Sequence, residues 1–482
     1  MKLSIENFGA IKKRIVLEPK PLTVFCGANN TGKTYALYVL NAFMDSRFVA
    51  SFDLAKHHAK PLLQSKSITL THDDWLGATV LRHAQANLSH SLKESLQRFF
   101  VTDGALIEAA EFGIDIDPDE VLAAAPSAES NPGPVADLQI SLRHSAASEG
   151  VIFCQWQSKA EGLTISLQGD WPTAQRVETG LNRLFMALYF PQRQGGRDFL
   201  LPAERSGINL FFRELNSRRA ALLRHVTSQT LDTNELLKDI IISRYPQPIH
   251  DYIEFMNSQP EIKREQSTFA DLAAWLQKEV LKVKYKVDRY GDISIAPLRS
   301  GAEIGLHLGS STVKTFFGLW SYLNHLARQG DWLMIDEPEL NLHPRNQRGI
   351  ARLLAQLVNR GIHVVVSTHS DYMLREWSNL LMLGDDFEGR DGMARQFGLP
   401  REQWLSTRQV AAYEFESSAA SAMSISAESG IRTTLFDENI QELNDAAQSI
   451  YYARQACLPE NDSDITARNS TKPSRGNRRE RG

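Results

Sequence analysis

The chain has 482 residues, a formal net charge of −4 and 42% hydrophobic residues. This length exceeds one usual core and predicts two or three lobes, and the slightly negative charge excludes a global attraction to nucleic acid or acidic membranes. Its three cysteines are too far apart for a metal knuckle and too few for a disulfide framework, which favours a reducing compartment.

The first residues read as a strand. Met1–Glu6 alternates apolar and polar side chains, without the charged and then apolar order of a leader peptide. No apolar run approaches the roughly 20 residues that a membrane-spanning helix needs. We therefore expect a cytoplasmic protein with no membrane partner.

A complete phosphate-binding loop follows the apolar run Leu22–Cys26. The segment Gly27–Thr34 reads GANNTGKT, with glycines at both ends that let several backbone N–H groups converge on phosphate oxygens. Lys33 would approach the β- and γ-phosphates, the Thr34 hydroxyl would face Mg²⁺, and the helix starting within Thr31–Tyr35 would direct its positive dipole end at the anion. The alternative is a plain glycine turn.

The predicted cofactors are therefore ATP and Mg²⁺. The residues of this segment expected to bind the nucleotide are Gly27, Asn29, Asn30, Thr31, Gly32, Lys33, Thr34 and Tyr35.

The middle of the chain is less informative. Three alternating stretches, Asp137–Leu142, Val151–Gln157 and Leu163–Leu167, are consistent with an antiparallel sheet, and the pieces on either side look helical. Ala125–Ala136, with three prolines, is expected to be a loop. No heptad pattern is sustained over three or four repeats, so a long coiled-coil arm is not supported.

Two basic stretches lie in and after this middle part. The first holds arginines on a helical pattern, and the second holds lysines at strand spacing. The residues are Arg213, Arg218, Arg219 and Arg224 in the first, and Lys282, Lys284, Lys286 and Arg289 in the second. Such stretches are either solvated faces or a track for a phosphate backbone.

A short segment precedes a later helix. Leu308–Lys314 opens a helix predicted over Lys314–Leu326, and Ser310 and Ser311 are natural caps for it. The plain interpretation is a helix start. The same hydroxyls and exposed N–H groups also form a ready anion site.

The apolar strand Trp332–Ile335 ends in two adjacent carboxylates, Asp336 and Glu337. Ligands collect at the carboxyl edge of a parallel sheet, where two carboxylates side by side are costly without a cation. Asp336 is suited to hold Mg²⁺ opposite Thr34, and Glu337 could polarise an attacking water as general base. The alternative is an acidic turn after a strand.

A third strand, Ile362–Thr368, ends in His369. A helix over Asn346–Asn359 would cross over to it from the carboxylate strand, as parallel neighbours require. Lone histidines are usually structural, but an imidazole at this edge could hydrogen-bond the γ-phosphate and report its presence.

Together these segments resemble the ABC-type ATPases, in particular the stand-alone branch that includes chromosome-maintenance, break-repair and OLD-like ATPases. Besides the phosphate loop, the resemblance rests on Ile5–Ile11 and on the run Asp336–Pro344. Leu308–Lys314 resembles a degenerate signature loop, with Gly309 to Thr312 reading GSST where the common form is Ser-Gly-Gly-Gln.

The resemblance implies roles for further residues. Ser310, Ser311 and Lys314 would contact the γ-phosphate held by a second subunit, and His369 would be the switch histidine. Asn341 and His343 would lie at the subunit boundary. The catalytic set is then Lys33, Glu337 and His369, with Thr34 and Asp336 as metal ligands.

A glutamine loop, which the ABC-type family often has, is not evident. The nearest candidate is Phe199–Gly207, a strand that ends in the charged pair Glu204 and Arg205. The pair couples the nucleotide state to the helical lobe or is a surface ion pair.

The expected fold is an α/β ABC-type ATPase head, with a mixed, largely parallel central sheet flanked by helices and a large α+β insertion. Residues 1–45 form the N-terminal part of the head, residues 46–280 the insertion, residues 281–455 the C-terminal part of the head and residues 456–482 a basic, disordered tail. Near the C-terminus, Val410–Phe415 is expected to be a strand and Asn439–Ala453 a helix.

The resemblance also implies partners. We expect a homodimer or larger homo-oligomer that acts as an ATP-dependent switch in a bacterial antiphage system of the Septu or PARIS type. Because the sequence contains no cluster typical of a nuclease centre, the effector would be a separate HNH or TOPRIM-type nuclease or a toxin. The alternatives are a DNA-maintenance ATPase that clamps DNA, in which case nucleic acid is a partner, and a nucleotide-stabilised scaffold with little turnover.

Overall fold

The computed structural model describes residues 1–102, 104–123, 138–145, 148–156, 162–214, 245–299 and 302–456. The chain divides into two compact units, Met1–Arg432 and Thr433–Gly482. In the second unit the structure describes one long helix, α16 (Thr434–Ala456), where the sequence predicts a helix over Asn439–Ala453. The arginines at positions 218, 219 and 224, the predicted loop Ala125–Ala136 and the basic tail lie outside the described residues.

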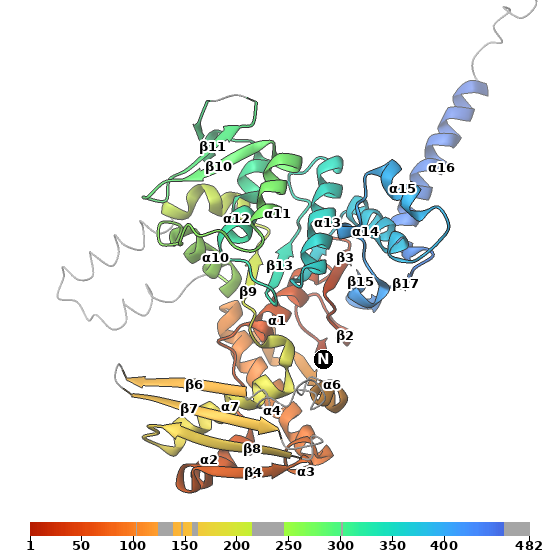
Figure 1. The fold of residues 1–482 in the computed structure, drawn as a ribbon. Coiled ribbons are helices and arrows are strands. Elements are labelled where there is room, and N and C mark those ends of the chain that lie inside the picture. Colours follow the sequence, from red (N-terminus) through yellow and green to blue (C-terminus); the bar gives the residue numbers. More distant parts are fainter. Residues whose placement is uncertain are drawn as a thin grey trace, which may run out of the picture. The chain divides into compact units, whose positions relative to one another are not determined.

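A six-stranded sheet forms the centre of the first unit, in the order β16-β15-β3-β14-β13-β9 (Figure 1). Its strands are β3 (Leu22–Gly27), β9 (Asp198–Leu201), β13 (Trp332–Asp336), β14 (His363–Thr368), β15 (Val410–Glu416) and β16 (Ala419–Ala422). All neighbouring pairs are parallel except β15 with β16. The expected mixed, largely parallel α/β sheet is therefore confirmed.

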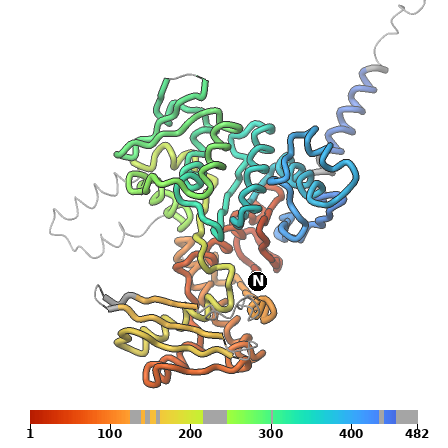
Figure 2. Tube along the Cα trace, in the orientation of Figure 1, coloured from red at the N-terminus to blue at the C-terminus, as the bar shows by residue number. Residues whose placement is uncertain are grey.

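The inner strands are apolar because both of their faces are covered. Every residue of β3 and β13 is buried, as is usual for parallel strands between helices. Helix α1 (Lys33–Met44) packs on β3, β14, β13 and β9, and helix α13 (Pro344–Asn359) packs on β14. Figure 2 shows the red N-terminal segment with β3 and α1 beside the later segment with β13 and β14, where β3 pairs with β14 and α1 packs on β13, although hundreds of residues separate the two segments in the chain.

The other helices of the carboxyl half surround this core. They are α10 (Gln247–Asn257), α11 (Ala270–Trp275), α12 (Ser311–His325), α14 (Asp371–Gly384) and α15 (Arg390–Phe397). A small antiparallel sheet there contains β10 (Val283–Val287), β11 (Ile293–Pro297) and β12 (Ile304–Gly305), and the hairpin β17 (Ile425–Ser426) with β18 (Gly430–Ile431) lies near α14. Lys284 and Lys286 point outward from β10, and Lys286 forms an ion pair with Glu303.

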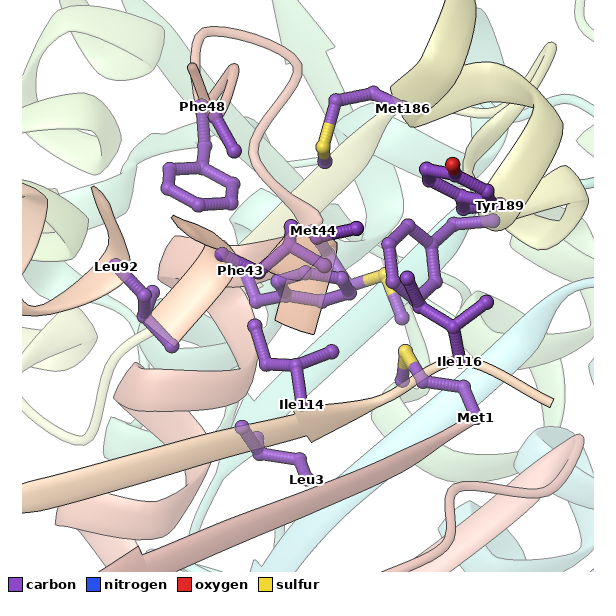
Figure 3. Close-up of a cluster of buried hydrophobic side chains, with 14 of the residues drawn as sticks. Met1, Leu3, Phe43, Met44, Phe48, Leu92, Ile114, Ile116, Met186 and Tyr189 are labelled. Atoms are coloured by element: carbon purple, nitrogen blue, oxygen red, sulfur yellow. The ribbon is translucent and has the colours of Figure 1, made fainter. Parts of the chain in front are cut away.

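A second, antiparallel sheet joins the N-terminus to a later part of the chain. It has the order β2-β1-β5, formed by β1 (Lys2–Glu6), β2 (Ile15–Leu17) and β5 (Glu111–Asp115). Alternate residues of β1 point inward, and Figure 3 shows Leu3 and Ile114 facing Phe43 of α1 in a buried apolar cluster. This cluster ties the phosphate-loop helix to the first sheet of the chain.

The third sheet confirms the antiparallel strands expected in the middle of the chain. Its order is β4-β8-β7-β6, with β6 (Leu138–Ser145), β7 (Ser148–Trp156) and β8 (Gly162–Gly169), and with β4 (Ser67–Thr71) as a strand that the sequence did not predict. Helices α2 (Asp53–Ser65) and α7 (Ala174–Tyr189) pack on it (Figure 1). The shorter helices nearby are α3 (His72–Leu76), α5 (Ala105–Glu108) and α6 (Pro118–Ala123), and the long α4 (Ala78–Phe100) packs on α1 and β5.

The division of the chain differs from the expected one in two places. Residues 46–280 do not all stand outside the head, because β9 is the edge strand of the central sheet and β5 pairs with β1. Along the chain, the boundary between the two compact units falls between Arg432 and Thr433 rather than at residue 455. Pairing between distant strands accounts for the first difference, and the rest of the division remains a prediction. Among the described residues, no helix is both long enough and apolar enough to cross a membrane.

Candidate nucleotide and metal site

The phosphate loop, Gly27–Thr34, connects β3 to α1 and needs glycine at both ends. Gly27 has φ 138°, and a Cβ there would lie 2.1 Å from the carbonyl oxygen of Phe415. Gly32 has φ 105°, and a Cβ there would lie 2.6 Å from the Ile11 side chain. A Cβ at either position would clash with these neighbours. Glycine is therefore required for the tight turn that brings the loop N–H groups together.

Lys33 folds back into the loop. Its Nζ donates hydrogen bonds to the carbonyl oxygens of Gly27 at 3.1 Å and Ala28 at 2.6 Å, and the Thr31 hydroxyl also donates to the Ala28 carbonyl at 2.9 Å. Burial lowers the pKa of Lys33, and the charges of Glu337 and Asp336 oppose that effect. A buried cation whose partners are neutral carbonyls is suited to an incoming anion.

The structure brings Asp336 and Thr34 together, as the sequence predicts. The Thr34 hydroxyl lies 3.1 and 3.3 Å from the two carboxylate oxygens of Asp336, and the Ser367 hydroxyl donates to the same carboxylate. Asp336 is only 2% exposed, and burial raises its pKa to about 6. A hydroxyl and a carboxylate are hard oxygen donors of the kind that Mg²⁺ prefers, so these residues fit a magnesium ion shared with a nucleotide.

The protein supplies few metal ligands beyond these. Within the described ranges, no group of three or more His, Cys, Asp or Glu side chains could hold a metal ion. Magnesium enters phosphate sites of this kind with one or two protein oxygens, and phosphate and water supply the remaining ligands.

Glu337 and His369 form the second part of the site. His369 Nε2 lies 3.4 Å from Glu337 Oε1, and both side chains are about 30% exposed. The hydrogen bond from His369 lowers the pKa of Glu337 and so keeps its carboxylate ionised. An ionised carboxylate that water can reach can act as a general base.

Strand β14 lies between the strands that carry the phosphate loop and the carboxylate pair. This interposed strand supplies both Ser367, which donates to Asp336, and His369, which meets Glu337. The backbone N–H of His369 also donates to Glu339 Oε1 at 2.5 Å. Glu339 is a buried carboxyl, whose pKa burial raises, and the sequence did not single it out as a site residue.

Ser310 and Ser311 lie at the start of α12. The Ser310 side chain caps the helix by accepting from the Val313 N–H at 3.4 Å, as expected for a helix start, and both serines are exposed. Lys314 lies one turn further and is half-buried. The Thr312 hydroxyl donates to the Asn341 carbonyl at 2.6 Å, so this helix start adjoins the loop after the carboxylate pair.

The remaining candidates divide into exposed and packed side chains. Asn29 and Asn30 are exposed on the phosphate loop, and Asn30 has φ 60°. The Tyr35 ring packs on Phe8 and Phe100, with centroid distances of 5.3 and 6.0 Å. His343 caps α13 through the Arg345 N–H. The nucleotide-binding roles of Asn29, Asn30 and Tyr35 remain predictions, as do the roles of the other expected site residues, Gly27, Thr31, Gly32, Lys33, Thr34, Ser310, Ser311, Lys314, Asp336, Glu337 and His369.

Arg205 is the residue whose position the sequence did not reveal. It is 1% exposed and donates to the carbonyl oxygens of Asp336 at 2.6 Å and Glu337 at 2.7 Å. The alternative of a surface ion pair is therefore wrong for Arg205.

Comparisons with known proteins agree with a nucleotide-binding site. A family model described as an AAA ATPase domain matches residues 1–99 and 216–374, more than half of the chain. No curated protein matches the sequence.

Solved structures that resemble the chain include three SMC heads. The Smc head bound to the C-winged helix domain of ScpA is 12% identical, with 89% of this chain and 97% of that chain covered and a TM-score of 0.32. The SMC head domain from Thermotoga maritima is 10% identical, with coverages of 88% and 98% and a TM-score of 0.27. The Smc head domain with an extended coiled coil bound to the C-terminal domain of ScpA derived from Pyrococcus furiosus is 12% identical, with coverages of 92% and 98% and a TM-score of 0.30. Identities and scores this low do not bear on function.

Proposed function

Because the chain belongs to the AAA ATPase domain family, we propose that it binds ATP with Mg²⁺ at the phosphate loop and hydrolyses it between subunits. The single observation that carries the proposal is the contact of Thr34 with Asp336, whose oxygens lie 3.1 Å apart although 302 positions separate the two residues in the sequence. A buried aspartate beside a phosphate-loop hydroxyl has few other uses.

Each residue of the site has a role in this scheme. Lys33 and the loop N–H groups neutralise the phosphates, and Thr34 and Asp336 would hold the Mg²⁺ that polarises them. Glu337, kept ionised by His369, accepts the proton of the attacking water. His369 reports the γ-phosphate, because a ligand in contact with its ring changes the contact with Glu337.

The exposed Ser310 and Ser311 support a site completed by a second subunit. A helix start with hydroxyls and unpaired N–H groups attracts phosphate, and neither serine is covered in the single chain. ATP would then hold two copies together, and hydrolysis would release them.

For biology we propose a switch in a bacterial antiphage system, in which dimerisation controls a separate nuclease or toxin. The support is the sequence resemblance to OLD-like and related defence ATPases. A DNA-maintenance ATPase that clamps DNA, or a scaffold with little turnover, is the competing function.

The first experiment compares two substitutions in the site with two matched controls. Lys33→Ala should reduce ATP binding and turnover by at least about 100-fold. Glu337→Gln should reduce turnover by about 100-fold or more while ATP binding persists, and should accumulate a dimer on a sizing column with ATP. Lys60→Ala and Glu388→Gln, at exposed positions of α2 and the loop after α14, are the matched controls and should behave as the wild type. Unchanged turnover in Glu337→Gln would remove its role as general base.

A second experiment separates the biological alternatives. ATP-dependent DNA binding by the isolated chain that weakens with salt supports DNA maintenance. Co-purification with a nuclease or toxin that ATP releases or activates supports the switch. Tight ATP retention with turnover near zero supports the scaffold.

A further inference from the structure

Arg205 is a buried arginine whose fork spans two successive peptide groups. Nη1 donates to the carbonyl oxygens of Asp336 at 2.6 Å and Pro202 at 3.0 Å, and Nη2 donates to that of Glu337 at 2.7 Å. A planar guanidinium can hold two neighbouring carbonyls at once, whereas an ammonium group cannot match both in fixed geometry. The side chain therefore fixes the orientation of two peptide planes.

The chain places this arginine where the sheet ladder ends. Strands β9 and β13 pair in parallel up to Leu201 opposite Ile335. The residue after β9 is Pro202, and the pairing of the two strands stops there. Beyond this point the guanidinium of Arg205 donates to the Asp336 and Glu337 carbonyls. The Leu340 N–H also donates to the Glu337 carbonyl at 3.2 Å, so both carbonyls have the partners that buried groups require.

The two peptide planes flank Glu337, the proposed general base. Glu337 has φ 51°, in the left-handed region that side chains other than glycine rarely adopt. Its N–H donates to the Ser367 carbonyl at 3.0 Å on the β14 side. With that N–H and both flanking carbonyls held, φ and ψ of Glu337 are restrained, and so is the direction of its Cα–Cβ bond, from which the carboxylate reaches His369.

The helical segment that carries Arg205 is itself held in place. It spans residues 205–214, and in it Asn209 donates to the Lys314 carbonyl at 2.7 Å and accepts from the Tyr252 hydroxyl at 2.8 Å. Both Asn209 and Tyr252 are buried. A precisely held side chain needs such a supporting shell.

We propose that Arg205 is a positioning residue for ATP hydrolysis, which holds Glu337 in its left-handed conformation and so aims the carboxylate at the attacking water. The inference rests on the proposed function. It adds a device that acts through the backbone and does not touch the nucleotide.

The test compares Arg205→Lys with Arg193→Lys. Arg193 is the control, because it is a half-buried arginine that likewise donates to two backbone carbonyls, those of Asp45 at 2.7 Å and Phe48 at 2.9 Å, away from the site. In Arg205→Lys, kcat should fall about 10- to 100-fold, the range for a slightly misplaced catalytic group, while the Kd for ATP with Mg²⁺ changes less than about threefold. Arg193→Lys should lower Tm without lowering kcat.

A second readout needs no turnover. Amide hydrogen exchange of the peptide covering residues 332–342 should be about tenfold faster in Arg205→Lys than in the wild type, and unchanged in Arg193→Lys. If the wild type binds ATP but does not hydrolyse it, the proposed function fails, while the exchange data still test whether Arg205 holds the turn.

Three outcomes would overturn the inference. One is unchanged exchange in Arg205→Lys, another is an equal loss of kcat in both lysine variants, and the third is a rise in the Kd for ATP as large as the fall in kcat.

Discussion

Two buried aspartates lie at opposite ends of the same strand, β13, and their surroundings differ. Asp331, just before the strand, accepts hydrogen bonds from the Arg197 N–H at 2.8 Å, the Tyr322 hydroxyl at 2.8 Å and the Arg328 N–H at 2.9 Å. Asp336, at the carboxyl end, accepts from the Ser367 hydroxyl and more distantly from Thr34, and burial raises its pKa to about 6. The protein's own donors satisfy Asp331, whereas Asp336 has fewer donors and is the proposed ligand of a cation.

The contrast shows how to separate structural from functional charges in this chain. A buried carboxylate with several short backbone and side-chain donors stabilises the fold. A buried carboxylate with a raised pKa at the edge where ligands gather is a candidate for ligand binding. Substitution at each position should therefore change different properties.

The largest expected effect follows Asp336→Asn. Turnover should fall at least about 100-fold, because the metal loses its charged ligand. Without Mg²⁺ the variant should be no less stable than the wild type at pH 7, since an ionised Asp336 is unfavourable in the fold. Steady-state ATPase assays and thermal melts measure both effects. A large loss of stability with normal turnover per folded molecule would show that Asp336, like Asp331, has a structural role.

The next prediction tests whether Ser310 and Ser311 contact the nucleotide of another subunit. The proposed cation ligands, Thr34 and Asp336, by contrast lie together in one subunit. Lys33→Ala and Ser311→Glu should each be nearly inactive alone, and a mixture should recover about a quarter of wild-type activity, because half of the dimers are mixed and each has one intact site. A glutamate at a helix start does not harm the helix. Activity of the mixture equal to the sum of its parts would contradict a shared site.

Asp331→Asn should act on stability alone. An amide at this position would place its NH₂ group opposite groups that donate to the carboxylate in the wild type. The free energy of unfolding should therefore fall by about 2–3 kcal/mol. Chemical denaturation measures the loss, and kcat per folded molecule should stay at the wild-type value. A loss of kcat with unchanged stability would break the comparison.

The smallest effect is a pH dependence of stability and metal binding. The pKa of Asp336 is raised from 3.8 to about 6 in the fold, so its protonation stabilises the folded state fully below about pH 4, and this stabilisation is lost as the pH rises through about 6. Mg²⁺ requires the ionised form, so its affinity should fall roughly tenfold per pH unit below 6. Thermal melts at pH 5 and pH 7.5, with and without Mg²⁺, should show that Mg²⁺ raises the Tm more at pH 7.5 than at pH 5. In Asp336→Asn, Mg²⁺ should not raise the Tm at either pH.

The sequence predicted the parts of the site that local patterns encode. The phosphate loop is continuous in sequence, and Asp336, Glu337 and His369 each directly follow an apolar strand, so their common edge follows from the rule for parallel sheets. The bonds of Thr34 with Asp336 and of Glu337 with His369 agree with that expectation.

Other features depend on contacts between distant segments and could not be predicted. Nothing near Arg205 in the sequence shows that its guanidinium is buried against β13, and Asp331 looks like any acidic residue before a strand. Strand β4 has only five residues, SITLT, and it pairs with β8, which lies much later in the chain. In each case tertiary packing, and not local propensity, determines the structure.

The position of β9 limits how this protein can be shortened. A shortened chain that joined residue 45 directly to residue 281 would lack β9 and with it one neighbour of β13, together with Arg205 and the β5 partner of the first strand. The exposed edge of β13 would then be open to pairing with other chains, and such a minimal version should aggregate. Natural shortening of related chains should therefore fall in the β6–β8 hairpins and spare the strand that begins at Asp198.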